Sequence, residues 1–339
     1  MKRFFVILIL VVLGAATFIV YQILLADNEF EGDRFVTVSR DMNFRHVVDS
    51  LKSAGVIRSR TLFELAEKIV RADRHIKIGK YLFRSGMSNK DILDDLSTGR
   101  SSMLISVTIP EGLRIVSQAR IIKREVGIDS ARFALLAYNQ EYVRSLGIDA
   151  ETLEGFLFPG TYFFYWQTEE EEILGRLVQG FRESYVDSLQ ERAKELGLST
   201  NEILTLASIV EGEAIFDRER PIIAGVYYNR LKKRMRLEAD PTVQYAIGNG
   251  PRRLYYSDLR AESPYNTYRN YGLPPGPINS PGRASIIAAL YPTKTNYLFF
   301  AANGQGGHTF SRTYQEHQLA RRQLRKMREN SRQKQHEEQ

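Results

Sequence analysis

Hydrophobic and polar positions along this chain predict an N-terminal membrane-spanning helix followed by small units of strand and helix. Residues 4–26, FFVILILVVLGAATFIVYQILLA, contain no charged side chain, and as a helix they are long enough to cross a hydrocarbon layer about 30 Å thick. A cleaved signal peptide has a shorter apolar core and a small-residue cleavage site, and ILLADNEF offers a poor one. We therefore expect an uncleaved anchor.

Charges on either side of this segment predict its orientation. Lys2 and Arg3 precede it, and the acidic stretch DNEFEGD follows it within residues 27–35. By the positive-inside rule, residues 1–3 stay in the cytoplasm and the rest of the chain lies on the outer side of the membrane. We expect residues 27–35 to be a short linker.

A weak internal repeat follows the predicted linker. Segments 36–56, 81–100 and 107–127 each begin with alternating apolar residues, continue through a turn and end with helical spacing, which predicts a strand running into a helix in each. Residues 36–128 are therefore predicted to form a membrane-proximal region, either a carbohydrate-binding module or a spacer. The positions 6, 11 and 15 residues after the start of each segment are predicted to form one buried stripe. They are Met42, Val47 and Leu51, then Met87, Ile92 and Leu96, then Leu113, Gln118 and Ile122, of which only Gln118 is polar.

A different pattern begins near residue 150. The aromatic stretch LEGFLFPGTYFFYW, residues 153–166, is interrupted by a Pro-Gly pair and predicts a loop that leads into a buried strand. The acidic run TEEEEIL then begins a helix, because the helix dipole favours carboxylates at that end. The rings of Tyr162, Tyr165 and Trp166 are either core or a saccharide-binding surface.

The stretch STNEILTLASIVEGEA predicts a helix with a marked N-terminus. Ser199 and Glu202 form the S-x-x-E pattern of a capping box. The apolar residues that follow make one broad face, with Thr205 and Ser208 opposite it. Gly212 is predicted to end the helix.

Two glutamates, Glu211 and Glu213, flank the apolar face of this helix. A carboxyl group held against apolar side chains is harder to ionise, so it can donate a proton near neutral pH. The alternative is a helix-end glutamate in solvent or in a salt bridge with Arg218 or Arg220. The spacing alone does not choose between the two glutamates.

Composition narrows the classes of function. The chain has 339 residues, of which 43% are hydrophobic, enough for about two domains. It has no cysteine, which excludes disulfides and thiolate chemistry and suits an oxidising compartment. Much of the net charge of +7 lies in the basic polar tail, residues 321–339, and no basic stripe interleaved with aromatics predicts nucleic-acid binding. None of the five histidines is near Glu211 in the sequence, so neither a metal nor a cofactor is expected.

Four later segments combine polar and aromatic residues with Pro and Gly turns. They are GVYYNRL at 225–231, MRLEADPTVQYAIG at 235–248, SPYNTYRNYGLPPGPINSPG at 263–282 and GGHTF at 306–310. Loops on a rigid scaffold commonly carry binding residues, and Asn, Tyr, Thr and Arg can hydrogen-bond sugar hydroxyls and acetamido groups. Together these segments predict a saccharide-binding cleft.

The motifs EGFLFPGTY, ASIVEGEA, VYYNRL, MRLEADPTV, SPYNTY, GLPPGPI-x-x-PG and GGHTF occur in this order. By these motifs and their order, the chain resembles the YceG-like family of bacterial membrane-anchored endolytic murein transglycosylases. The resemblance covers nearly all of the sequence after residue 36. The resemblance implies an α+β protein with a single N-terminal transmembrane helix, a small LysM-like α/β module at 36–128 and an α+β catalytic domain at 150–320. Gly160 stands where this family carries an acidic residue, so no role is assigned to it.

The resemblance also implies site residues. The family's catalytic glutamate directly follows A-S-I-V, which is Glu211 here. Glu213, Asp240 or Glu238 would support the reaction, although Glu238 is expected to pair with the nearby Arg234 and Arg236, and His308 is expected to be structural. The candidate substrate-binding residues are Asp240, Thr242, Gln244, Tyr265, Asn266, Thr267 and Tyr268.

The implied reaction needs one carboxyl group rather than the pair of an ordinary glycosidase. Glu211 would protonate the MurNAc–GlcNAc bond, and the 6-hydroxyl of MurNAc would then close a 1,6-anhydro ring. The implied partners are peptidoglycan glycan strands and the peptidoglycan synthases, or penicillin-binding proteins, that make them. A hydrolytic muramidase and a non-catalytic peptidoglycan-binding scaffold are the alternatives.

Overall fold

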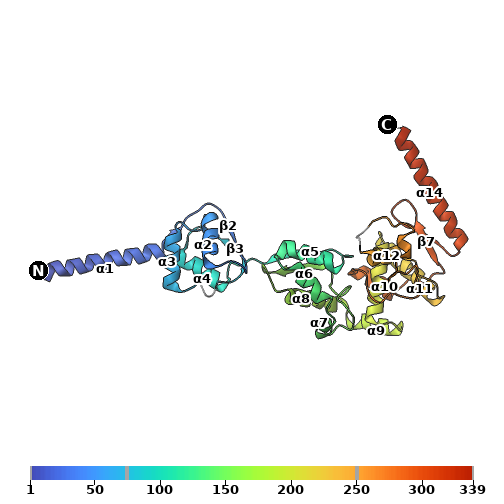
Figure 1. Cartoon of the computed structure of the whole chain (residues 1–339), viewed down its shortest axis with the longest axis horizontal. Helices are drawn as coiled ribbons and strands as arrows, with labels where there is room; N and C mark the ends of the chain where they lie inside the picture. Colours follow the sequence, from blue (N-terminus) through green and yellow to red (C-terminus); the bar gives the residue numbers. More distant parts are fainter. Residues whose placement is uncertain (1, 73–75, 249–251, 338–339) are drawn as a thin grey trace. The chain divides into compact units, whose positions relative to one another are not determined.

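The computed structural model describes residues 2–72, 76–248 and 252–337, which form two compact units (Figure 1). The chain mixes helices with short two-stranded sheets, so the predicted α+β class is confirmed. The first unit comprises Met1–Val107, Arg124–Ile128 and Tyr162–Glu169, and the second comprises Thr108–Lys123, Asp129–Thr161 and Glu170–Gln339.

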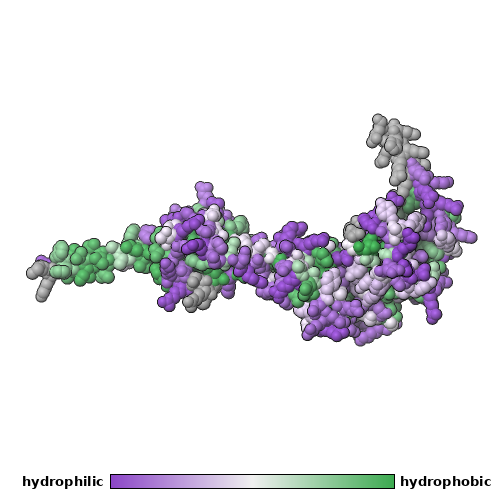
Figure 2. Space-filling view, in the orientation of Figure 1, coloured by the Kyte–Doolittle hydropathy of each residue, from purple (hydrophilic) through white to green (hydrophobic). Residues whose placement is uncertain are grey.

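The predicted apolar helix is present as α1 (Lys2–Leu24). Over Arg3–Leu24 it is long and apolar enough to cross a membrane, and 23 residues correspond to about 35 Å of helix. Figure 2 shows hydrophobic side chains exposed along most of its length. Only its last turn, at Ile23 and Leu24, packs into the core of the first unit.

Helices and two antiparallel strand pairs enclose the core of the first unit. β2 pairs with β3 from Arg34 opposite Phe83 to Val38 opposite Gly79, and β1 pairs with β4. Ser59 caps one helix, and Ser88 forms a capping box with Asp91 at another. The elements are β1 (Asp27–Asn28), β2 (Arg34–Val38), α2 (Phe44–Ser53), α3 (Arg60–Val70), β3 (Gly79–Phe83), β4 (Met87–Ser88) and α4 (Asn89–Thr98).

The strand-to-helix repeat has the predicted elements in all three segments. β2 leads to α2, β3 and β4 lead to α4, and β5 (Ile105–Ile109) leads to α5 (Ile115–Val126). Every stripe position is buried or partly buried, including the polar Gln118. Residues 108–123 of the third segment belong to the second compact unit. A LysM-like character for the region stays a prediction.

The segment expected to be a linker is folded at both ends. Asn28, in β1, donates to Asn89 Oδ1 at 3.0 Å, and Asn89 donates in turn to the Ile23 carbonyl at 2.8 Å. Residues 34 and 35 already belong to β2. These bonds join the last turn of α1 directly to α4 of the first unit.

Helices dominate the second unit, and α10 packs against α11, α12 and α13. The acidic run begins α8, as predicted. β6 pairs with β5, but only Phe164 of β6 is buried; the prediction of a buried strand there was wrong because the strand alternates between covered and exposed faces. The elements are α6 (Ser130–Ala137), α7 (Gln140–Ser145), β6 (Gly160–Phe164), α8 (Glu170–Ser184), α9 (Asp187–Glu195), α10 (Thr200–Glu213), η2 (Asp217–Glu219), α11 (Arg220–Lys232), α12 (Asp240–Ile247), η3 (Asp258–Arg260), α13 (Arg283–Leu290), β7 (Phe299–Ala302), β8 (His308–Ser311) and α14 (Tyr314–Glu337).

Candidate active site

The helix α10 carries both candidate glutamates at its C-terminal end. The predicted capping box of Ser199 and Glu202 is present, and the helix continues one residue beyond Gly212. The helix is buried on all sides from Ile203 to Val210, so Thr205 and Ser208 do not lie on an exposed face. Their hydroxyls donate within the helix, to carbonyls one turn earlier, which satisfies them without water.

Hydrogen bonds fix the loop of residues 278–282 against α10. The Ser208 hydroxyl accepts from Ile278 N–H at 3.0 Å, and the Asn279 amide donates to the Ser208 carbonyl at 2.9 Å. On the other side, Ser280 forms a bridge with Leu113, and the buried Gln118 amide donates to the Ser280 hydroxyl at 2.9 Å. Gln118 is therefore polar within an apolar stripe because it holds this loop.

Glu211 is buried beside a cation. Its Oε2 lies 3.1 Å from Arg220 Nη1 and accepts from Gly282 N–H at 3.0 Å. The exposed fractions of the Arg220 and Glu211 side chains are 9% and 8%. Arg220 also contacts Asp217 at 2.9 Å and the Ser285 hydroxyl. The salt bridge with Arg220 that the sequence left open as an alternative is thus present.

Glu213 has the opposite environment. The Tyr227 hydroxyl donates to its Oε1 at 3.2 Å. Burial raises the pKa of Glu213 to about 7, and the negative charge of Asp240 adds to the increase, while Tyr227 and Arg230 oppose it. With such a pKa, the carboxyl group is protonated in a large fraction of the molecules at neutral pH.

A cavity of about 570 Å³ opens beside Glu213, a size typical of small-ligand sites. Its lining includes Glu213, Asp240, Tyr268, Arg230 and residues of β7 and α14. The Tyr268 hydroxyl donates to Asp240 Oδ1 at 2.7 Å. The structure therefore brings two of the predicted substrate-binding residues together at one cavity, although Glu211 is not part of its lining.

Three other predicted substrate-binding residues lie beneath the surface. Thr242, Asn266 and Thr267 are at most 1% exposed. The hydroxyls of Thr242 and Thr267 hydrogen-bond each other at 2.9 Å, and the Asn266 amide donates to two backbone carbonyls. Their polar groups are used inside the protein, where they shape the loops.

The last two predicted substrate-binding residues lie away from the cavity. Gln244 donates to the Arg252 carbonyl at 3.0 Å. The ring of Tyr265 lies 4.7 Å from that of Tyr245, and Arg114 lies 4.3 Å above the Tyr245 ring. Gln244 and Tyr265 are only partly buried, so substrate contact by them stays a prediction.

One expected ion pair has a different partner, and the histidine expected to be structural has one inside the protein. Glu238 pairs with Arg230 at 3.1 Å, so the expectation of Arg234 and Arg236 was wrong; the chain turns at Glu238, where φ is +49°. His308 contacts Glu219 at 2.7 Å through Nδ1, as a structural histidine would.

Of the three aromatic residues considered for a saccharide surface, Tyr165 is half exposed, and Tyr162 and Trp166 contact other side chains. Trp166 donates to the Ser39 hydroxyl at 3.3 Å, and Lys80 lies 4.3 Å above its ring. Tyr162 stacks with Phe164. Trp166 is therefore part of the packing of the first unit.

Glu111 is a site residue that the sequence analysis missed. It lies in the turn between β5 and α5. Its carboxyl group lies beside the Gly282 Cα, because a Cβ built on Gly282 would be 2.0 Å from Glu111 Cδ. Burial and the charge of Glu211 raise the pKa of Glu111. The turn I-P-E-G-L after a predicted strand was a local signal for Glu111. Its neighbour Glu211, however, is 100 positions away in the sequence.

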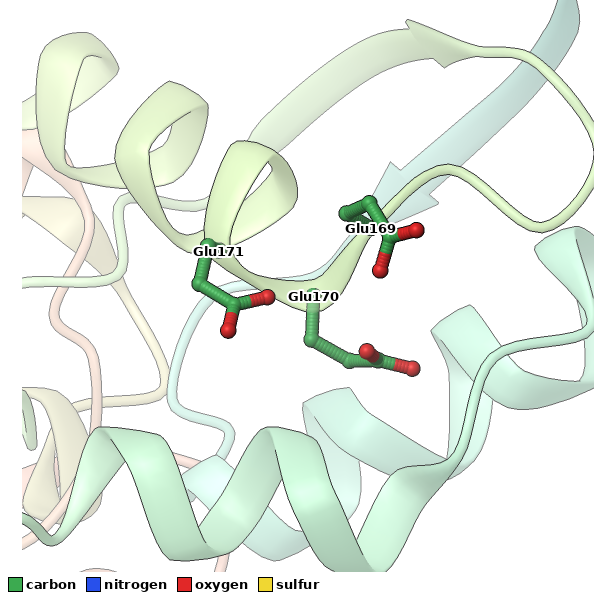
Figure 3. A group of neighbouring side chains, drawn as sticks. All are labelled: Glu169, Glu170 and Glu171. Atoms are coloured by element: carbon green, nitrogen blue, oxygen red, sulfur yellow. The ribbon is translucent and has the colours of Figure 1, made fainter.

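Three consecutive carboxylates at the start of α8, Glu169, Glu170 and Glu171, have ligand atoms within 4.8 Å of one another (Figure 3). Arg132 of α6 lies 3.4 Å from Glu170 and 2.5 Å from Glu171. Glu170 also accepts from Asp129 N–H at 2.9 Å. Glu169 pairs instead with Arg40 at 2.7 Å. Since all three carboxylates have partners in the protein, Glu170 and Glu171 are explained as an attachment of α8 to α6.

The chain is similar to several known proteins. A relative from Bacillus subtilis named endolytic murein transglycosylase is 34% identical over 81% of this chain and 80% of its own length. One of the same name from Streptococcus pneumoniae is 27% identical over 84% of this chain and 57% of its own. The crystal structure of a yceG-like protein from Listeria monocytogenes matches with a TM-score of 0.61 and 31% identity, covering 86% of this chain and 99% of that one. The YceG-like family model matches residues 36–323, so the chain belongs to the YceG-like family.

Proposed function

We propose that this chain is an endolytic lytic transglycosylase of peptidoglycan, which cleaves the β-1,4 bond between MurNAc and GlcNAc and leaves a 1,6-anhydroMurNAc end. The names of its relatives support this activity. The observation that carries the proposal is the fixed position of Glu211, at the end of a fully buried helix and within reach of a cation and a backbone N–H. As an enzyme it is a carbon–oxygen lyase.

The reaction uses one carboxyl group twice. Glu211 donates its proton to the glycosidic oxygen as the bond from this oxygen to C1 of MurNAc breaks. Arg220 and Gly282 N–H then stabilise the carboxylate that forms. The carboxylate takes the proton of the MurNAc 6-hydroxyl while O6 bonds to C1, so no water is consumed and the acid is regenerated.

The cavity beside Glu213 is the proposed binding site for sugars further along the glycan strand, away from the scissile bond, since Glu211 is not part of its lining. Asp240 and Tyr268 offer hydrogen-bonding groups there, and the aromatic side chains of β7 offer ring faces. Asp240→Asn and Tyr268→Phe should raise KM for glycan more than they lower kcat, since they touch substrate away from the reacting atoms.

Digestion of purified uncrosslinked glycan followed by mass spectrometry tests the reaction. The expected product ends in anhydroMurNAc, one water lighter than the reducing end that a hydrolytic muramidase would leave. Glu211→Gln should lower turnover by about 10² to 10⁴-fold without unfolding the chain. A folded Glu211→Gln variant with normal turnover would remove Glu211 from the mechanism, and a wild-type chain that binds glycan without cutting it would favour the scaffold.

Glu213 is the second candidate for the acid, because its pKa of about 7 suits a proton donor at neutral pH. The two assignments differ in the matched variant Glu213→Gln. If Glu211 is the acid, Glu213→Gln should keep far more turnover than Glu211→Gln. The reverse order would exchange their roles.

We further propose that α1 anchors the chain in the inner membrane, with its N-terminus in the cytoplasm and both compact units outside. The apolar length of α1 and the basic residues before it support this orientation. A reporter that is active only outside the cytoplasm, fused after residue 339, should be active. Activity of a cytoplasm-only reporter at the same position would reverse the orientation.

The anchor would hold the enzyme close to membrane-bound peptidoglycan synthases, its proposed neighbours, whose nascent strands it would cut to length. The bonds from β1 to α4 and from α4 to α1 leave little free chain between the membrane helix and the first unit. Replacing residues 1–26 with a cleavable signal peptide should leave activity on purified glycan nearly unchanged and weaken control of strand length in cells. Equal control by the released protein at equal abundance would contradict the proposal.

A further inference from the structure

A second carboxyl group, that of Glu111, lies at the Glu211 end of α10. Gly282 N–H donates to Glu211 at 3.0 Å, and the Glu111 carboxyl carbon is 2.0 Å from where a Gly282 Cβ would be. Bond lengths place a Cβ within about 3 Å of its own backbone nitrogen, so the two carboxyl groups are at most about 8 Å apart. The φ of Gly282 is −73°, which any residue adopts. The end of the Glu111 side chain occupies the space beside Gly282 and would have to move for any larger residue there.

Backbone hydrogen bonds hold the turn that carries Glu111 in this position, although the residue is partly open to solvent. Gly112 N–H donates to the Ser280 carbonyl at 2.8 Å, and Ser280 N–H donates to the Leu113 carbonyl at 2.9 Å. Gly112 itself is close to Glu211: a Cβ on it would lie 3.5 Å from Glu211 Cγ. The turn that carries Glu111 is thus fixed to the same loop that contacts Glu211.

The charges around Glu211 come from several elements. Arg220 begins α11 and lies 3.1 Å away, and Asp217 of η2 binds the other edge of the same guanidinium at 2.9 Å. Burial raises the pKa of Glu111, Glu211 and Asp217 raise it further, and Arg220 lowers it. On the far side of Gly212, Glu213 faces Asp240. The negative charges of Glu111 and Glu211 repel each other.

We propose that Glu111 is a positioning residue for the proposed reaction, whose carboxylate offsets the charge of Arg220 and lets Glu211 keep the proton that the glycosidic oxygen needs. This inference rests on the proposed function. Glu111 and Asp217 already place two carboxylates near the guanidinium of Arg220, so ionised Glu211 would add a third. Without Glu111, Arg220 would favour loss of the proton before substrate arrives. With Glu111 present, Arg220 stabilises the carboxylate after the proton has been transferred.

The test is the pH profile of kcat/KM for the full chain in detergent, with purified uncrosslinked glycan strands as substrate. Loss of the acid's proton sets the alkaline limb of such a profile. Glu111→Gln removes the opposing charge, so this limb should move to lower pH. Activity well below the limb should stay close to normal. Glu111→Asp keeps the charge and should restore most of the profile.

Gly282→Ala provides a second, independent variant. Its methyl group would displace the Glu111 carboxyl group while leaving both glutamates and the Gly282 N–H in place. The limb should move in the same direction as in Glu111→Gln, and adding Gly282→Ala to Glu111→Gln should move it no further. Glu191→Gln, which neutralises an exposed carboxylate of α9, is the control and should leave the profile unchanged.

The outcomes separate this inference from the proposed function. An unmoved limb in Glu111→Gln, or an equal loss of activity at all pH values in a folded variant, would overturn the role of Glu111 while Glu211→Gln still abolished cleavage. A wild-type chain that forms no anhydro product, or an active Glu211→Gln variant, would overturn both.

Discussion

Glu154→Gln should make the second unit more stable at alkaline pH and leave it unchanged at acid pH. Glu154 is 1% exposed, and its Oε1 accepts from Ile115 N–H at 3.1 Å, at the start of α5. Burial raises the pKa of Glu154 from 4.5 to about 7, against the opposing effects of Ile115 N–H, Arg114 and Tyr138. Glutamine resembles the protonated acid, since it keeps an acceptor for Ile115 N–H and cannot ionise.

The sign of the effect follows from proton linkage. Because the folded pKa lies above the unfolded one, the folded state binds more protons between pH 4.5 and about 7. The stabilisation from the protonated Glu154 is complete below about pH 4.5 and is lost as pH rises through about 7. The shift corresponds to about 3 kcal/mol in the free energy of unfolding. Glu154→Gln should recover up to this amount at pH 8 and gain nothing at pH 4.

Hydrogen exchange by mass spectrometry on the full chain is the suitable assay. The single tryptophan, Trp166, lies against the C-terminal end of α5, next to Gly127, so its fluorescence would not report on the contact of Glu154 with Ile115 at the other end. Amides of α5 and α6 should exchange more slowly in Glu154→Gln than in wild type at pH 8, and equally at low pH. The exposed Glu151→Gln is the control. Equal protection of variant and wild type at pH 8 would show that Glu154 is not buried as an acid. Some pH dependence should remain, because the pKa of Glu213 is raised similarly.

Three further predictions concern stability and the site. Ser199→Ala should cost about 1 kcal/mol of unfolding free energy through loss of the α10 cap, measured by thermal or urea unfolding; no change would mean the cap is dispensable. Gly225→Ala should destabilise by about 1–3 kcal/mol, because its Cβ would collide with the Thr293 carbonyl. Gly175→Ala in α8, with open space around it, should instead stabilise by about 0.5–1 kcal/mol, so equal effects would refute the collision. Arg220→Lys keeps the charge but loses the second edge that holds Asp217, and should lower kcat at least about tenfold with little change in KM; unchanged kcat would contradict the role of Arg220.

Local signals in the sequence predicted the elements well. Each of these signals depends on residues within a few positions of one another. They are the change in spacing of apolar residues from strand to helix, the capping box at Ser199 and the acidic start of α8. The same local reasoning failed for Glu238, for which the nearest arginines in sequence were expected. Its partner is Arg230, which lies one helix earlier and is held by the carbonyls of residues 236 and 237.

The candidate site could be predicted only in part, because its contacts join distant segments. The pattern placed Glu211 and Glu213 at a helix end, but the meeting of Glu111 with Gly282 depends on the bridge from Leu113 to Ser280. The polar loops likewise predicted binding residues, but they did not indicate whether the side chains face a ligand or the protein interior. Thr242 and Thr267 satisfy each other inside the protein, a pairing that composition does not show.

The different surroundings of Glu211 and Glu213 follow from helix geometry. Two residues along a helix correspond to a rotation of about 200°, so the side chains leave the end of α10 in nearly opposite directions. Glu211 faces the beginnings of α11 and α13, where Arg220 and Gly282 N–H are, and Glu213 faces the beginning of α12, where Asp240 is. Between them, Gly212 lets Pro241 approach, since a Cβ on Gly212 would be 2.7 Å from the proline ring. Three helices thus begin around the end of a fourth, and the residue each presents there decides which carboxyl group has a cation beside it and which keeps its proton.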